Sequence, residues 1–301
     1  MSLLQKTTIL LLLVFTISSC SKTIDDEIPT KGDGTEPVEN RFDYSTLEDG
    51  IPESVVYHVN PKFPVRTDSL RILAIGNSFT DDAMQYMDDM VQLSGLDYDR
   101  LAIYSLTEGS SSFDVWIGKD YEASVIQLRH ESGGAQMKSK GSLHELLAQN
   151  WDVIVIQQVS NLSFDWKSFS SLKEYEEKLL TYCTNPSVCL AFQLVWSHAA
   201  KEMPYVLEGN IACCKKMMKR YGIDIIIPSG VAIQNARTSF LGDNLNRDGH
   251  HLNMCEGRYI AALVLYEVIT GKSSIGVHYH PENMTDFMCK RGFGIIIIII
   301  G

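Results

Sequence analysis

The chain has 301 residues and a formal net charge of −11, with 26 basic against 37 acidic side chains. Nucleic-acid binding needs clustered basic side chains, so this acidic and dispersed balance argues against nucleic acid as a partner. The length is sufficient for one domain with a full hydrophobic core.

The amino terminus has the pattern of a processing signal. Lys6 precedes an apolar stretch from Thr8 to Ile17, which is too short to span a membrane. We therefore expect a signal peptide over residues 1–19. The following cysteine, Cys20, is either left as a free thiol by ordinary cleavage or modified.

The residues around the cleavage point resemble a bacterial lipobox. Ile17-Ser18-Ser19-Cys20 carries this resemblance, which implies that Cys20 is lipidated and becomes the first mature residue. The acidic residues 25–27 look like the surface-export signals of Bacteroidetes lipoproteins. The resemblance implies an exported lipoprotein at the outer membrane, on the cell surface or facing the periplasm, with the lipid anchor as its only membrane attachment.

Composition divides the rest of the chain into three parts. Residues 20–68 are rich in Pro, Gly, Asp, Glu, Thr and Ser, which predicts a lipid-anchored flexible tether. Residues 69–290 carry the folded domain. Residues 291–301 contain six consecutive isoleucines, an aggregation-prone run that we interpret as an artefact of the sequence.

Short apolar segments alternate with amphipathic ones through the domain, which predicts strands and helices in turn. The region from 114 to 140 is polar and is expected to be irregular. The predicted strands are Ile72–Ile75, Leu101–Leu106, Trp151–Gln158, Val188–Trp196 and Ile223–Pro228. The predicted helices are Asp81–Leu93, Ser142–Gln149, Ser170–Cys183, Glu208–Tyr221 and Cys255–Ile269.

Five apolar strands separated by helices predict an α/β fold, a three-layer α/β/α sandwich around a five-stranded parallel sheet. The carboxyl ends of parallel strands lie at one edge of the sheet, where open α/β folds bind ligands. Polar turns that follow different strands are therefore expected to be neighbours in space.

The first of these turns offers a nucleophile. Gly76-Asn77-Ser78-Phe79-Thr80 follows a buried strand and precedes a helix, for which Thr80 is the expected N-cap. Ser78 would lie at the positive end of that helix, where negative charge is favoured. An ordinary strand-to-helix loop is the alternative interpretation of this segment alone.

The loop before the last helix offers an acid and a base. Asp248 precedes His251 by three residues, a spacing that can place the carboxylate against the imidazole Nδ1 and leave Nε2 facing a nucleophile. His250 is the rival base, but the Asp-x-x-His spacing favours His251.

These two segments together resemble the SGNH (GDSL-type) hydrolases, in the group of Bacteroidetes lipoproteins whose first block is Gly-Asn-Ser-Phe-Thr. The resemblance covers about residues 69–271 and implies a flavodoxin-like fold. It also implies that Ser78 is the nucleophile, with Asp248 and His251 as acid and base. The expected oxyanion hole combines the N–H groups of Ser78 and Gly109 with an amide side chain.

The third block departs from the superfamily pattern. In place of Gly-x-Asn-Asp, this chain has Gln157-Gln158-Val159-Ser160-Asn161. Either Gln158 or Asn161 can donate through its NH₂ group, so the chemistry permits both. The doubled glutamine ends an otherwise apolar strand, which favours Gln158.

We expect neither a cofactor nor a metal. No C-x-x-C pair is present, and of the seven cysteines Cys183 and Cys189 are the nearest non-adjacent candidates for a disulfide. The resemblance implies a serine esterase that removes acetyl or similar acyl groups from polysaccharides, with an acylated carbohydrate as substrate. The alternatives are a non-catalytic surface glycan-binding lipoprotein and an acyltransferase that uses the same triad.

Overall fold

A computed structural model of the protein describes residues 43–47, 69–93, 100–131, 135–199, 206–223 and 225–274, with residues 277, 279, 281 and 284. The expected signal peptide, Cys20, the tail at 291–301 and all of the tether except 43–47 lie outside the described residues.

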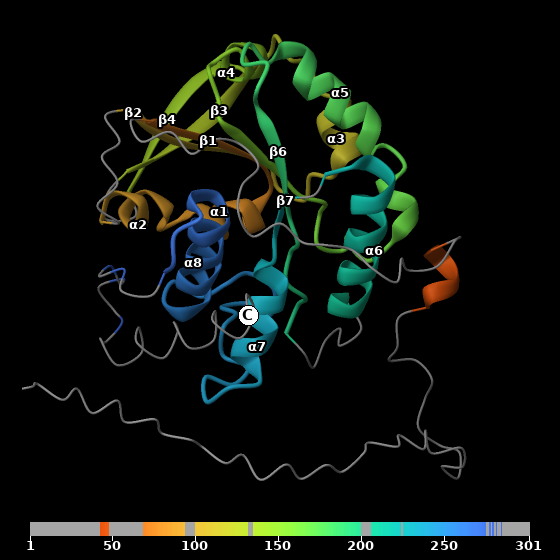
Figure 1. The fold of residues 1–301 in the computed structure, drawn as a ribbon, viewed down its shortest axis with the longest axis vertical. Helices are drawn as coiled ribbons and strands as arrows, with labels where there is room; N and C mark the ends of the chain where they lie inside the picture. Colours follow the sequence, from red (N-terminus) through yellow and green to blue (C-terminus); the bar gives the residue numbers. More distant parts are fainter. Residues whose placement is uncertain are drawn as a thin grey trace, which may run out of the picture. The chain divides into compact units, whose positions relative to one another are not determined.

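The domain is built on one sheet (Figure 1). Its strands are β1 (Ser69–Gly76), β2 (Arg100–Thr107), β3 (Ser124–Glu131), β4 (Ala135–Ser142), β5 (Val153–Ile156), β6 (Cys189–Gln193) and β7 (Ile225–Ile227). They lie in the order β4-β3-β2-β1-β5-β6-β7. The five neighbouring strands β2, β1, β5, β6 and β7 pair in parallel. Strand β3 pairs antiparallel with both β2 and β4. The α/β prediction and its five parallel strands are confirmed, but the sheet has seven strands rather than five.

The two additional strands form a hairpin inside the region that was expected to be irregular. In β3 the buried residues include the polar Gln127 and His130, which obscure an apolar pattern. Strand β4 lies at the edge of the sheet and is mostly exposed, so it lacks an alternating apolar pattern. Its Lys138 and Lys140 are typical of edge strands, where charged side chains discourage pairing with another chain.

Helices cover both faces of the sheet (Figure 1). They are α1 (Ser78–Met84), α2 (Met87–Leu93), α3 (Phe113–Ile117), α4 (Leu143–Leu147), α5 (Leu172–Tyr182), α6 (Val206–Tyr221), α7 (Ser229–Arg237) and α8 (Glu256–Thr270), with the short 3-10 helices η2 (Tyr44–Leu47) and η4 (Trp166–Phe169). None of the helices in the described ranges has the length and apolar character needed to cross a membrane.

Each face of the sheet has its own core because successive side chains of a strand point to opposite faces. Ile72 and Ala74 of β1 pack with α1, α2, α7 and α8. Leu73 and Ile75 of the same strand pack with α3, α4, α5 and α6. The three-layer sandwich follows from this division.

Three local predictions differ from the structure. The helix expected over Asp81–Leu93 is two helices, α1 and α2. The cap of α1 is Asn77 and not Thr80, since the Asn77 side chain accepts a hydrogen bond from the Phe79 N–H. Cys183 and Cys189 are free cysteines, so the disulfide considered for them is not formed.

One buried histidine joins the antiparallel hairpin to the parallel sheet. His130 of β3 is 1% exposed, and its Nε2 lies 2.9 Å from the Ser105 Oγ of β2. Ser105 in turn donates to Asp81, so the imidazole Nε2 is the donor and its Nδ1 is left without a partner. Burial lowers the pKa of His130 from 6.5 to about 4, because desolvation disfavours the imidazolium.

We therefore expect His130 to make stability depend on pH. The unfolded chain binds a proton at His130 below about pH 6.5, whereas the folded chain does so only below about pH 4. Stability is thus retained above pH 6.5 and lost as the pH falls towards 4. At pH 4.5 the loss due to His130 is about 2 kcal/mol. Urea unfolding at pH 7.5 and 4.5 tests this expectation. Between these two pH values the free energy of unfolding should fall by about 2 kcal/mol less in His130→Gln than in the wild type. An equal fall in both proteins would contradict the expectation.

Candidate active site

The turn between β1 and α1 is fixed by close packing at Gly76. A Cβ atom there would lie 2.3 Å from the Thr80 Oγ1 and 2.8 Å from the Gln157 Cγ, so any larger residue would displace these two side chains. Ser78 comes two residues later as the first residue of α1. Its N–H is among the first four of the helix, which have no intrahelical acceptor.

Asn77 holds this turn from both sides. Its Oδ1 accepts hydrogen bonds from the Phe79 N–H at 3.0 Å and from the Gln157 Nε2 at 2.8 Å. Its Nδ2 donates to the carbonyl oxygen of Ser111, which follows β2. The side chain is buried. Asn77 therefore links the carboxyl ends of β1, β2 and β5 beside Ser78.

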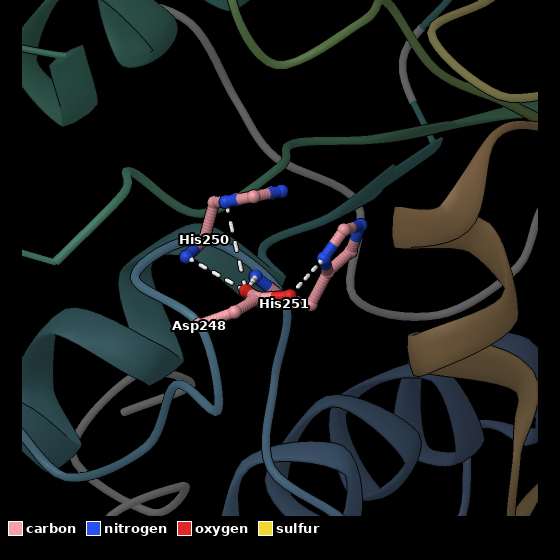
Figure 2. Close-up of side chains that lie close together, drawn as sticks. All are labelled: Asp248, His250 and His251. Atoms are coloured by element: carbon pink, nitrogen blue, oxygen red, sulfur yellow. Dashed lines mark hydrogen bonds and ion pairs between the residues drawn. The ribbon is translucent and has the colours of Figure 1, made fainter.

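The acid and base lie on the loop before α8. The Asp248 Oδ2 lies 2.7 Å from the His251 Nδ1. Figure 2 draws this contact as a dashed line. The Asp248 Oδ1 accepts hydrogen bonds from the backbone N–H groups of His250 and His251 at 3.2 and 2.8 Å. An antiparallel bridge between Asn246 and Leu252 closes the loop around them.

These contacts hold the Asp248 carboxylate in its charged form. Its partial burial would raise the pKa of Asp248. The hydrogen bonds from the His251 side chain and from the N–H groups of His250 and His251 outweigh that effect, so the pKa lies well below its ordinary value. Asp248 can thus stabilise an imidazolium at His251.

Ser78 and His251 meet across 173 positions of sequence. The His251 Nε2 lies 2.7 Å from the Ser78 Oγ, within hydrogen-bond distance. Ser78, His251 and Asp248 therefore form one continuous chain of hydrogen bonds at the carboxyl edge of the sheet. This is the arrangement that lets an imidazole accept a proton from an attacking hydroxyl.

A residue that the sequence analysis did not single out holds the two segments together. Asp82 lies one turn after Ser78 on α1 and is fully buried. Its Oδ2 accepts from the Leu252 N–H at 2.7 Å, next to His251 in the chain. Its Oδ1 lies 3.0 Å from an Arg247 nitrogen and 2.6 Å from an Arg258 nitrogen. Asp82 thus ties the helix of the nucleophile to the loop of the base.

We expect Asp82→Asn to lower kcat by about 10-fold to 100-fold, since a small displacement of a catalytic group costs that much. Ester turnover by the folded variant is the measurement. Asp81→Asn is the matched control. Asp81 directly precedes Asp82 on the same helix, but its carboxylate accepts hydrogen bonds from Ser105 and Thr107 of β2. Equal activity of the Asp82 and Asp81 variants would show that the loop does not depend on this carboxylate.

Gly109 lies in a turn beside the nucleophile. The Glu108 N–H donates to the carbonyl oxygen of Gly76, and the Ser111 hydroxyl donates to the same oxygen. Ser110 adopts a φ of 57°, a left-handed conformation that is uncommon for a residue other than glycine. Gly109 itself is exposed. The turn is therefore pinned to the end of β1 with the Gly109 backbone at the surface.

The two amides considered for the oxyanion hole are in different situations. Gln158 is fully buried, and its Nε2 donates both hydrogens to Ser168, one to the carbonyl oxygen and one to the Oγ. Its Oε1 accepts from the Val159 N–H. Asn161 is exposed in the turn that follows. The contacts of Gln158 are therefore structural, and the preference for it as the donor is not supported.

An aromatic wall backs the site. Phe79, which follows Ser78, stacks on Trp196 with ring centroids 4.4 Å apart and tilts against the His251 ring at 6.0 Å. The Trp196 Nε1 donates to the carbonyl oxygen of His250. His198 lies against both Phe79 and His250, and its Nε2 is 3.4 Å from the Ser160 Oγ. The ends of β5 and β6 thus complete one side of the site.

Within the described residues, the loop that carries Asp248 also brings together three side chains whose atoms could bind a metal ion. They belong to Asp248, His250 and His251 and lie within 4.8 Å of one another.

The fold and the site define an α/β sandwich with a Ser-His-Asp constellation at the carboxyl edge of its parallel strands. The chain belongs to the family described as a domain of unknown function, DUF4886, whose model matches residues 71–290. The crystal structure of a DUF4886 family protein from Bacteroides uniformis ATCC 8492 is similar to it. The two chains are 29% identical with a TM-score of 0.70, over 77% of this chain and 96% of that one.

Two more distant structures were also found. A candidate SGNH hydrolase from Slackia heliotrinireducens is 20% identical, with a TM-score of 0.42 over 67% of this chain and 99% of that one. A candidate GDSL-like lipase from Parabacteroides merdae ATCC 43184 is 14% identical, with a TM-score of 0.44 over 70% of this chain and 99% of that one. A comparison with curated proteins found no match.

Proposed function

We propose that the protein is a serine esterase of the SGNH type. The observation that carries this proposal is the unbroken series of contacts from the Ser78 Oγ to the His251 Nε2 and from the His251 Nδ1 to Asp248, both 2.7 Å long. An ordinary solvated polar loop would not be expected to bring the Asp248 carboxylate, the His251 imidazole and the Ser78 hydroxyl into successive hydrogen bonds. The resemblance of the two sequence segments to SGNH hydrolases points to the same chemistry.

In the proposed reaction His251 removes the Ser78 proton while the Ser78 Oγ attacks an ester carbonyl. Asp248 orients the imidazole and stabilises its charged form. The N–H groups of Ser78 and Gly109 donate to the oxyanion of the tetrahedral intermediate. His251 then returns the proton to the leaving alcohol, and water releases the acyl group by the same steps.

We expect Ser78→Ala to reduce the turnover of p-nitrophenyl acetate by about 10⁴-fold or more, because the nucleophile acts as a unit with its base. Asp248→Asn should also lose activity but retain the fold. Ser45→Ala, at an exposed serine of η2, is the control for the substitution itself. Unchanged turnover by the Ser78 variant would overturn the proposal.

The third oxyanion donor in this proposal is Asn161, since both amide hydrogens of Gln158 are used by Ser168. Asn161 follows Ser160, which borders the same wall of the site through His198. Its exposed amide is available to a substrate.

Asn161→Ala should therefore lower kcat by about 10²-fold to 10³-fold with a small change in KM, as loss of one oxyanion donor does. Steady-state kinetics on p-nitrophenyl acetate give both constants, and Asn244→Ala, at another exposed asparagine, is the control. A kcat within threefold of the wild type would assign the third donor elsewhere.

The proposed substrate is an acylated polysaccharide from which acetyl or similar groups are removed. We predict a signal peptide, lipidation at Cys20 and a location at the outer membrane, where an enzyme would encounter polymeric glycans. We propose no nucleic acid partner. Release of acetate from acetylated glycans distinguishes this from the alternatives. A glycan-binding protein would bind without release, and an acyltransferase would give a product that depends on an acceptor sugar.

A further inference from the structure

We propose that Asp248, His250 and His251 form a binding site for Zn²⁺ whose occupancy switches the esterase off. The ion is an external ligand in this proposal and takes no part in turnover. Its inhibitory effect rests on the proposed function, whereas its binding does not.

All three donor atoms lie within 4.8 Å of one another, and the two separations that involve Asp248 are close to those that this ion needs. Zinc binds imidazole nitrogen and carboxylate oxygen at about 2.0–2.2 Å, and tetrahedral geometry then separates neighbouring ligand atoms by about 3.4 Å. The His250 Nδ1 lies 3.5 Å from the Asp248 Oδ1, close to that value. The His251 Nδ1 lies 2.7 Å from the Asp248 Oδ2 and must move away by about 0.7 Å. The two imidazole rings are neighbours, with centroids 4.0 Å apart, and Figure 2 shows dashed lines from both residues to the one carboxylate.

The loop presents these donors on a backbone that is already held. The His250 carbonyl oxygen accepts from the Trp196 Nε1 and from the Asn246 Nδ2, and its N–H donates to Asp248. The His250 side chain is 42% exposed and has no role in the proposed mechanism. Zinc binding therefore requires adjustment of side chains only, with water as the fourth ligand.

Binding at this position blocks His251 through its tautomer. In the resting site the His251 Nδ1–H faces Asp248, and Nε2 is free to accept the Ser78 proton. Zinc needs the lone pair of Nδ1, so a Zn–N bond forms while the single proton of the neutral imidazole moves through water from Nδ1 to Nε2, with no net release of a proton. A protonated Nε2 cannot accept a proton from Ser78. Zinc also takes the Asp248 carboxylate away from the imidazole.

Isothermal titration of the full chain with ZnCl₂ tests the site, with turnover of p-nitrophenyl acetate measured in parallel. The wild type should bind zinc at this site and should lose turnover as the site fills. His250→Ala should keep its zinc-free turnover and lose at least tenfold in affinity and in inhibition. Ser78→Ala should lose turnover but still bind zinc.

His144→Ala is the matched control. His144 lies outside the site, where its Nδ1 is 2.8 Å from the Glu122 Oε1 in an exposed pair, so this substitution should not affect zinc binding. Equal zinc affinity of the wild type and His250→Ala would overturn the proposal. Zinc binding by a wild type that shows no turnover would overturn the esterase and leave the metal site standing. Turnover that is unaffected by bound zinc would overturn the inhibition.

Discussion

The buried carboxylate of Asp82 is the contact on which the site geometry depends. Ser78 belongs to a helix packed on the sheet, while Asp248 and His251 belong to an irregular loop that comes about 170 residues later in the sequence. Hydrogen bonds to a charged group contribute about 1.5–3 kcal/mol each. Asp82 makes such bonds to the backbone of Leu252 and to two arginines, and so fixes the loop against α1.

The sheet supplies the second constraint, because its parallel strands deliver the remaining groups to one edge. Gly109 follows β2, Asn161 follows β5, and His198 follows β6. Asn77 is buried and ties the carboxyl ends of β1, β2 and β5 together, so it shapes the turn beside Ser78. The site is therefore assembled from short segments, each of which is held by contacts behind it.

The sequence was sufficient to predict the parallel strands and the meeting of Ser78 with His251, because both follow from hydrophobic pattern and topology. It could not reveal Asp82, one of whose partners is a backbone N–H 170 positions away. Nor could it show that the Gln158 amide donates to Ser168, in a loop whose path no pattern predicts, and the structure therefore does not support the preference for Gln158. The edge strand β4 was missed because exposure removes the apolar alternation that marks a strand.

The central claim is that His251 activates Ser78, and the rate of covalent labelling by a fluorophosphonate measures that activation directly. Mass spectrometry of the labelled protein should find one adduct, on the peptide that contains Ser78, and His251→Ala should label more slowly by orders of magnitude. An adduct on another residue, or the same labelling rate with and without the imidazole, would contradict the account.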